Sequence, residues 1–199
     1  MSAVFGAPGR TLELDGFGSV TDIGILSQWC HDTFDRAPAD DEIADVQSAF
    51  LKALERAANE DASPFDPTPG LRRWIAHRAA QGGVLGIATG GWGMTARWKL
   101  RRAGLDEFEL PLASSDDAAQ RTEIMRIALE RSGGPSGESV TYVGDGPWDL
   151  AASRALGWDF IGIASGTAAR HLRASGARLV IDNFNALLPA AAPTRAYPS

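Results

Sequence analysis

The feature that most constrains the fold is an alternation of predicted helices with short, mostly apolar runs along residues 70–189. The runs are Val84–Ala88, Glu107–Leu112, Val140–Val143, Phe160–Ile163 and Arg178–Ile181. Apolar strands that are separated by helices are typical of a parallel sheet whose two faces are both covered. We therefore predict an α/β fold in which a parallel sheet carries helices on both faces.

Helical periodicity accounts for the segments between these runs and for much of the chain before them. The helices predicted in the second zone cover residues 71–81, about 95–103, about 119–131, 148–156 and 168–174. In the first zone, Thr21 or Asp22 is suited to cap a helix with Leu26 and Trp29 on its apolar face. A second helix follows Pro38.

Prolines in residues 59–69 mark a linker between the two zones. We therefore expect a helical region over residues 1–67 and an α/β core over residues 68–189. Residues 190–199 are rich in Ala and Pro and are expected to form a flexible tail.

Composition excludes several classes of partner and site. The net charge of −6 and the lack of a basic block argue against nucleic acid as a partner. The single cysteine, Cys30, excludes an internal disulfide and a cysteine-cluster metal site. No apolar run reaches the roughly 18 residues that span a bilayer, and Met1–Arg10 lacks the apolar stretch of a secretory signal. We expect a cytoplasmic protein without a membrane partner, and the oligomeric state is left open.

Two acidic side chains follow the run Val140–Val143. Asp145 comes directly after this run in Gly144-Asp145-Gly146-Pro147-Trp148-Asp149, and Asp149 falls in the first turn of the next predicted helix. Because ligands bind at the carboxyl ends of parallel strands, both carboxylates are candidate ligands of Mg²⁺. The alternative is helix capping, with Asp145 as the N-cap and Asp149 as a first-turn acid.

A phosphate site is predicted at the end of the run Val84–Ala88. Thr89 and Gly90 begin the segment Thr89-Gly90-Gly91-Trp92-Gly93, whose hydroxyl and backbone N–H groups suit a phosphate oxygen. The alternative is an ordinary glycine-rich turn.

Arg121 lies near the start of a predicted helix, where the helix dipole disfavours a cation. A bound phosphate or clustered carboxylates would offset that cost. The alternative is a surface arginine paired with Asp117.

Taken together, these residues resemble the haloacid dehalogenase-like hydrolases, which are mainly Mg²⁺-dependent phosphatases. Ile87-Ala88-Thr89-Gly90 is similar to their second motif, in which Thr or Ser binds the phosphoryl group. Arg121 stands where the third motif carries a Lys or Arg that offsets negative charge. Asp145 and Asp149 stand where the acids of the fourth motif hold Mg²⁺. The resemblance implies that Thr89 and Arg121 act in catalysis and, with Gly90, bind phosphate.

The resemblance also implies a domain arrangement. Residues 68–189 would form a Rossmann-like core, and residues 1–67 would form part of a small α-helical cap. In this family the first strand lies mid-sheet, between the second and the fourth.

The chain departs from the family at its first motif. Nowhere does it contain the Asp-x-Asp-Gly-Thr that supplies the nucleophile and the general acid/base. The nearest string, Leu12–Phe17, has Glu13 in the place of the nucleophile and Asp15 in the place of the second acid. A better match aligns Asp15–Ile23 with a cap segment that follows the motif, so we expect the central strand to be missing or replaced. Three explanations stay open: a start upstream of Met1, a truncated and inactive product, or a degenerate site at Glu13 and Asp15.

The expected function is that of a Mg²⁺-dependent phosphatase of small phosphorylated metabolites, with little or no turnover by these 199 residues alone. One alternative is a non-catalytic remnant that binds phosphate or metal, or an interaction module. A phosphomutase is the other alternative, because substrate choice lies largely in cap loops.

Overall fold

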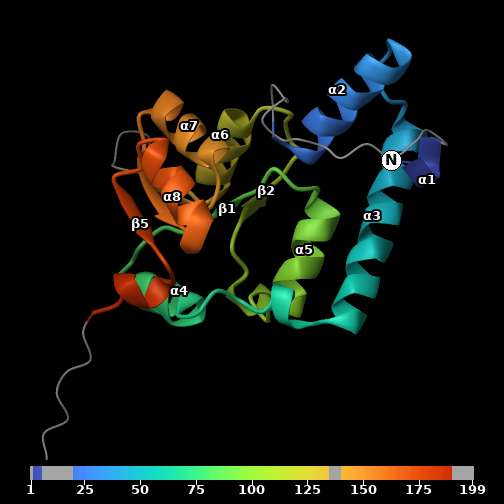
Figure 1. The fold of residues 1–199 in the computed structure, drawn as a ribbon. Helices are drawn as coiled ribbons and strands as arrows, with labels where there is room; N and C mark the ends of the chain where they lie inside the picture. Colours follow the sequence, from blue (N-terminus) through green and yellow to red (C-terminus); the bar gives the residue numbers. More distant parts are fainter. Residues whose placement is uncertain (1, 6–19, 135–139, 190–199) are drawn as a thin grey trace, which may run out of the picture.

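A computed structural model describes residues 2–5, 20–134 and 140–189 of the chain (Figure 1). Its α-helices are α1 (Ser2–Phe5), α2 (Asp22–Phe34), α3 (Asp40–Glu60), α4 (Leu71–Ala80), α5 (Gly93–Arg102), α6 (Arg121–Arg131), α7 (Pro147–Leu156) and α8 (Gly166–Ala174). Its strands are β1 (Ile87–Ala88), β2 (Leu112–Ala113), β3 (Thr141–Gly144), β4 (Asp159–Ile163) and β5 (Leu179–Ile181). Short 3-10 helices cover Ser63–Phe65, Asp106–Phe108 and Phe184–Leu187. The fold class is α/β, as predicted.

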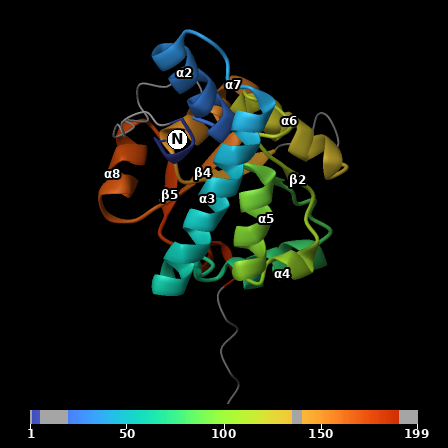
Figure 2. The ribbon, with the colours of Figure 1, turned by 90° about the vertical axis from the view of Figure 1, so that its right-hand side faces the viewer.

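The first zone is helical, and α2 begins where the sequence indicates. The Thr21 hydroxyl accepts a hydrogen bond from the backbone N–H of Gly24 at 3.1 Å, which caps the helix. The apolar face of α2 packs against α3 and the start of α5 in a cluster formed by Leu26, Trp29, Cys30, Val46 and Trp92. Helices α3 and α5 run side by side, as Figures 1 and 2 both show. The division of the chain near residue 67 stays a proposal; the residue lies between α3 and α4.

The strands pair in parallel, but within the described residues they form two sheets. One sheet has the order β1-β2 and the other has the order β3-β4-β5. Ile87 is in register with Leu112, and Thr141 with Asp159. Strands β1 and β3 are therefore the inner edges of two separate sheets. Among the residues that the structure describes, a single hydrogen bond joins these edges: the Tyr142 hydroxyl donates to the Ala88 carbonyl at 2.9 Å.

Helices cover the strands from both sides. Helices α6, α7 and α8 pack against the strands and contact one another in sequence order. Side chains of α4 and α5 face α6 across the space between β1 and β3. This arrangement brings the carboxyl ends of β1 and β3, and the loops that follow them, to one end of the molecule.

The boundaries of two predicted strands were wrong. Residues 106–108 form a 3-10 helix rather than a strand, Glu109 has the left-handed φ of 48°, and only Leu112–Ala113 pairs. The left-handed turn and Pro111, which has no N–H to donate, delay the strand. Strand β1 likewise begins at Ile87 rather than at Val84, a residue that is 53% exposed.

Some expectations fall outside the described residues. They concern the string Leu12–Phe17 with Glu13 and Asp15, and the tail over residues 190–199. The loss or replacement of a central strand therefore remains a prediction. In the described ranges, none of the helices has the length and apolar character needed to cross a membrane.

Candidate functional site

The loop after β1 is held in one conformation by its neighbours. The backbone N–H of Thr89 donates to Ala113 at 3.0 Å, so Thr89 extends the strand. Its hydroxyl accepts from the N–H of Gly91 at 3.1 Å. A Cβ on Gly90 would lie 2.9 Å from the Val20 carbonyl and still closer to the Arg121 guanidinium. Glycine is therefore required at position 90, because the chain passes directly beneath that arginine.

The loop after β3 places Asp149 rather than Asp145 in the capping position. Asp149 Oδ2 accepts from the backbone N–H groups of Asp145 and Gly146, both at 3.1 Å. A Cβ on Gly144 would lie 2.6 Å from this oxygen, so a larger residue would displace the carboxylate. Gly146 is the N-cap of α7, and the expectation of Asp145 as N-cap was wrong. The Asp145 side chain makes no hydrogen bond or ion pair with the rest of the described chain.

Arg121 is the first residue of α6 and joins the Asp149 carboxylate of α7 to the residue just before the N-cap of α2. Its Nη1 donates to Asp149 Oδ1 at 2.9 Å, and its Nη2 donates to the Val20 carbonyl at 2.7 Å. The side chains of Arg121 and Asp149 are only 15% and 4% exposed. The buried carboxylate offsets the unfavourable position of a cation at a helix N-terminus. The alternative pairing with Asp117 was wrong, since that carboxylate pairs with Arg131.

Burial dominates the electrostatics of this ion pair. It raises the pKa of Asp149, while the Arg121 charge and the backbone hydrogen bonds act in the opposite direction. Burial also raises the pKa of Tyr142, whose ring lies beside this pair. The same cause raises the pKa of Asp22, which accepts from the N–H of Trp92 at 2.9 Å.

A cavity of about 500 Å³ lies above these loops, and we call it the polar pocket. It is lined by Val20, Thr21, Asp22, Ile25, Ala88, Thr89, Gly90, Gly91, Arg121, Tyr142, Val143, Gly144, Asp145, Trp148, Asp149 and Ile163. The structure thus brings together all five side chains or backbone positions that the sequence singled out: Thr89, Gly90, Arg121, Asp145 and Asp149.

Three donors of residues that line the polar pocket have no hydrogen-bond partner within the described residues. Arg121 Nε is buried and unpaired. The N–H of Gly90 has no hydrogen bond, and the Thr89 hydroxyl accepts one but donates none. Unpaired donors beside a buried cation are suited to the oxygens of an anion.

Sequence reasoning missed two contributions to the pocket. Val20 and Asp22 enter it from the helical zone, and the N–H of Asp22 donates to the Gly90 carbonyl at 2.7 Å. The helix-start pattern at Thr21 was the one available signal, and it indicates a cap rather than a contact with a distant loop. Tyr142 was also missed, because a residue inside a predicted strand gives no sign that its side chain crosses to another sheet.

The donor set suits Mg²⁺ only in a limited sense. Among the described residues, no three His, Cys, Asp or Glu side chains gather closely enough to hold a metal ion. Mg²⁺ nevertheless binds through one or two carboxylates together with water and a substrate phosphate. The free carboxylate of Asp145 fits that requirement, and Asp149 adds a second charge that Arg121 already partly neutralises.

Comparisons with known proteins agree with this arrangement. A profile of the haloacid dehalogenase-like hydrolases matches residues 5–157. A search of curated proteins found no match.

Among solved structures, a hydrolase from Pseudomonas syringae superposes with a TM-score of 0.64 at 21% identity, over 82% of this chain and 74% of that one. A candidate phosphatase from Clostridium difficile superposes with a TM-score of 0.56 at 15% identity, over 81% of this chain and 75% of that one. A candidate β-phosphoglucomutase from Bacteroides vulgatus superposes with a TM-score of 0.51 at 18% identity, over 82% of this chain and 65% of that one. At these identities the structures support the fold. Since the family profile spans most of the chain, the protein belongs to the haloacid dehalogenase-like hydrolases.

Proposed function

We propose that the polar pocket binds the phosphoryl group of a small phosphorylated metabolite for Mg²⁺-dependent phosphoryl chemistry of the phosphatase type. The observation that carries this proposal is the set of unpaired donors around Arg121. Arg121, Gly90 and Thr89 line one cavity, so a tetrahedral oxyanion bound there would lie beside a guanidinium, a backbone N–H and a hydroxyl.

Each residue has a distinct role in this proposal. Thr89 and Gly90 hold phosphoryl oxygens, and Arg121 neutralises their charge. Asp149 fixes the orientation of the guanidinium through the 2.9 Å ion pair. Asp145 is the residue that would hold Mg²⁺, which when bound supplies positive charge to the phosphate.

A magnesium and phosphate titration tests the proposal through the melting temperature of the protein. Ligand at about ten times its Kd stabilises a protein by about 1.4 kcal/mol. For a chain of this size, that corresponds to a rise of about 3–6 °C in Tm. We expect this rise with MgCl₂ and orthophosphate together. Thr89→Val should reduce the response to phosphate, and Asp145→Asn should remove the dependence on magnesium.

The control variant is Asp159→Asn, which changes an exposed aspartate of β4 outside the polar pocket. It should leave the response intact. An unchanged Tm in the wild-type protein, or an equal loss in all variants, would contradict the proposal.

We further propose that the chain alone turns over little or no substrate. None of its residues forms the Asp-x-Asp-Gly-Thr motif that attacks phosphorus in the family. This favours a second candidate function, a non-catalytic module that binds phosphate or metal. Hydrolysis of p-nitrophenyl phosphate distinguishes the two: robust turnover that Asp145→Ala abolishes would contradict the proposed inactivity.

A further inference from the structure

The helical zone contributes one carboxylate to the polar pocket that the proposed phosphate site does not use. Asp22 is the first residue of α2 and lines the cavity together with Ile25 of the same helix. The backbone N–H of Asp22 donates to the Gly90 carbonyl at 2.7 Å. This hydrogen bond holds the start of α2, and with it the carboxylate, beside the loop that follows β1.

One oxygen of the Asp22 carboxylate has a partner and the other has none within the described residues. Oδ2 accepts from the backbone N–H of Trp92 at 2.9 Å, at the N-terminus of α5. Oδ1 accepts no hydrogen bond, and no cation of the described chain lies within ion-pair distance of this side chain. Burial raises the pKa of Asp22; Asp116 adds to this, and Lys99 and Arg121 oppose it from farther away. A group that donates to Oδ1 would therefore meet a carboxylate whose charge no direct contact neutralises.

Asp22 also lies close to the hydroxyl that is proposed to hold the phosphoryl group. A Cβ added to Gly91 would lie 3.4 Å from Thr89 Oγ1 and 3.6 Å from Asp22 Oδ2. Both oxygens are thus neighbours of the same glycine. A short substituent on a phosphoryl group held by Thr89 can therefore reach the Asp22 carboxylate.

The charges around the polar pocket decide which substituent fits there. The charged residues that line it are Asp22, Arg121, Asp145 and Asp149. Arg121 pairs with Asp149, and Asp145 is the proposed magnesium ligand, which leaves Asp22 without a cation of its own. A second anionic group of the substrate would be repelled by Asp22, whereas an ammonium group would be attracted. Trp148 lines the same cavity, and the face of an indole ring also attracts cations.

We propose that Asp22 selects the substrate of the polar pocket, a phosphomonoester whose organic part carries an ammonium group on a short carbon chain. The ammonium group donates to Asp22 Oδ1 while Thr89, Gly90 and Arg121 hold the phosphoryl oxygens. This inference rests on the proposed function and adds the class of substrate to it. Asp22 acts by recognising the part of the substrate that does not react.

Calorimetric titration with three phosphate esters of equal size tests the inference, with MgCl₂ present throughout. The probes are 2-aminoethyl phosphate, 2-hydroxyethyl phosphate and propyl phosphate, which end in an ammonium, a hydroxyl and a methyl group. We expect 2-aminoethyl phosphate to bind at least ~10-fold more tightly than either of the others.

Orthophosphate, titrated in the same way, separates this inference from the proposed function. If orthophosphate binds but 2-aminoethyl phosphate binds no better than the hydroxyl or the methyl ester, the ammonium assignment is wrong and the phosphate site stands. A protein that binds neither orthophosphate nor any of the esters would contradict the proposed function and this inference with it.

Two aspartate variants separate substrate recognition from helix capping. Asp116 Oδ2 accepts from the backbone N–H of Gly93 at 3.1 Å, so it also caps α5, but Asp116 is exposed and does not line the polar pocket. Asp22→Asn keeps an acceptor for the Trp92 N–H and removes the charge. It should reduce the preference for 2-aminoethyl over propyl phosphate to less than ~3-fold, and Asp116→Asn should leave the preference at ~10-fold or more.

A preference that survives in Asp22→Asn, or that both variants lose equally, would overturn the inference. Circular dichroism checks the fold of both variants. If Asp22→Asn misfolds, the comparison of the three esters on the wild-type protein decides.

Discussion

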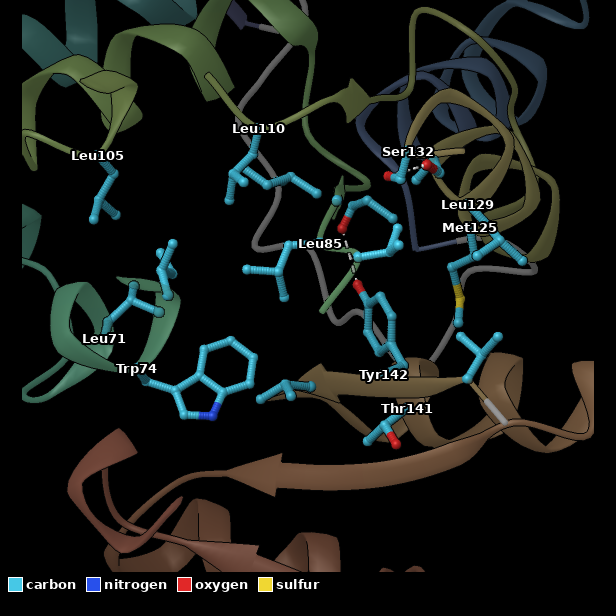
Figure 3. Close-up of a pocket in the computed structure, with 18 of the residues that line it drawn as sticks. Leu71, Trp74, Leu85, Leu105, Leu110, Met125, Leu129, Ser132, Thr141 and Tyr142 are labelled. Atoms are coloured by element: carbon cyan, nitrogen blue, oxygen red, sulfur yellow. Dashed lines mark hydrogen bonds between the residues drawn. The ribbon is translucent and has the colours of Figure 1, made fainter. Parts of the chain in front are cut away.

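The polar pocket lies at the carboxyl ends of β1 and β3, and the inter-sheet slot is the apolar cavity of about 360 Å³ between these two strands (Figure 3). The two regions differ in how fully their polar groups are hydrogen-bonded. In the polar pocket, the Asp149 carboxylate receives hydrogen bonds from two backbone N–H groups and from Arg121. In the slot, the Tyr142 hydroxyl makes the single hydrogen bond that the described residues form between the two inner edges. The loops at the strand ends are held together by side-chain and backbone contacts. Two sheets become one only when their edge strands are paired through backbone hydrogen bonds. The polar side chains at the strand ends therefore lie together although the two sheets do not pair with each other in the described residues.

The largest effect should come from breaking the ion pair of the polar pocket. Arg121→Ala leaves the Asp149 carboxylate buried without its cation, which we expect to lower the free energy of unfolding by about 3–5 kcal/mol. Urea denaturation measures the loss. The control is Arg126→Ala, whose pair with Glu123 is 61% and 51% exposed and should cost less than about 1 kcal/mol. Equal losses of unfolding free energy in the two variants would show that the buried ion pair contributes no more to stability than the exposed one.

Truncation of a leucine should cost more stability in the close-packed cluster of α7 and α8 than at the cavity between the sheets. Leu172 is 1% exposed in the cluster of α7 and α8, and Leu172→Ala should cost about 2–5 kcal/mol. Leu85→Ala, in the slot, should cost less than about 1.5 kcal/mol, because its side chain already borders a cavity. The comparison fails if thermal or urea unfolding gives the two variants the same loss.

Removal of the hydroxyl that joins the sheets should have a smaller effect. Tyr142→Phe keeps the ring and deletes the hydrogen bond to Ala88, at an expected cost of about 0.5–1.5 kcal/mol. Hydrogen exchange of the β1 and β3 amides should rise in this variant while the amides of α8 stay unchanged. A uniform rise over the whole chain would mean that the hydroxyl stabilises the fold rather than this one junction.

The smallest effects are those of pH, and they should have opposite signs at two carboxylates. Burial raises the pKa of Asp149 above its usual 3.8, so the folded state holds this proton more tightly than the unfolded state does. Its contribution to stability is present below 3.8 and is lost as the pH rises through the folded pKa.

At the exposed pair of the helical zone, the Arg36 guanidinium lowers the pKa of Glu42 from 4.5 to about 2. The contribution of Glu42 is therefore present above 4.5 and is lost as the pH falls towards 2. NMR titration of the carboxyl carbons measures the pKa values of both side chains, with Asp149→Asn and Glu42→Gln for assignment. Shifts in the same direction would refute the distinction between the buried and the exposed pair.

The sequence predicts the polar pocket better than the sheet beneath it. Thr89 and Asp149 were singled out because the residues that follow parallel strands meet at one edge, which depends only on the order of strands and helices. Arg121 was singled out because a cation is unfavourable at the start of a helix. Asp22 escaped prediction because the fold of the helical zone, and not a local pattern, brings it to Gly90.

Pairing of strands is the part that local sequence does not determine. Val84 and Leu85 have the composition of a strand, yet β1 begins at Ile87, and the two earlier residues line the cavity between β1 and β3. Strand propensity describes how a residue fits a pleated surface, and it does not decide whether a segment pairs with a neighbouring strand. For the same reason, the hydrophobic periodicity of the sequence does not predict that the strands form two separate sheets.

The account depends on the polar pocket being an oxyanion site, and an anomalous-scattering map of crystals soaked in tungstate tests this most directly. Tungstate is a tetrahedral oxyanion that stands in for phosphate. We predict its peak in the polar pocket, with oxygens within hydrogen-bond distance of Thr89, Gly90 and Arg121. A polar pocket without tungstate, in crystals whose surface sites carry it, would contradict the account.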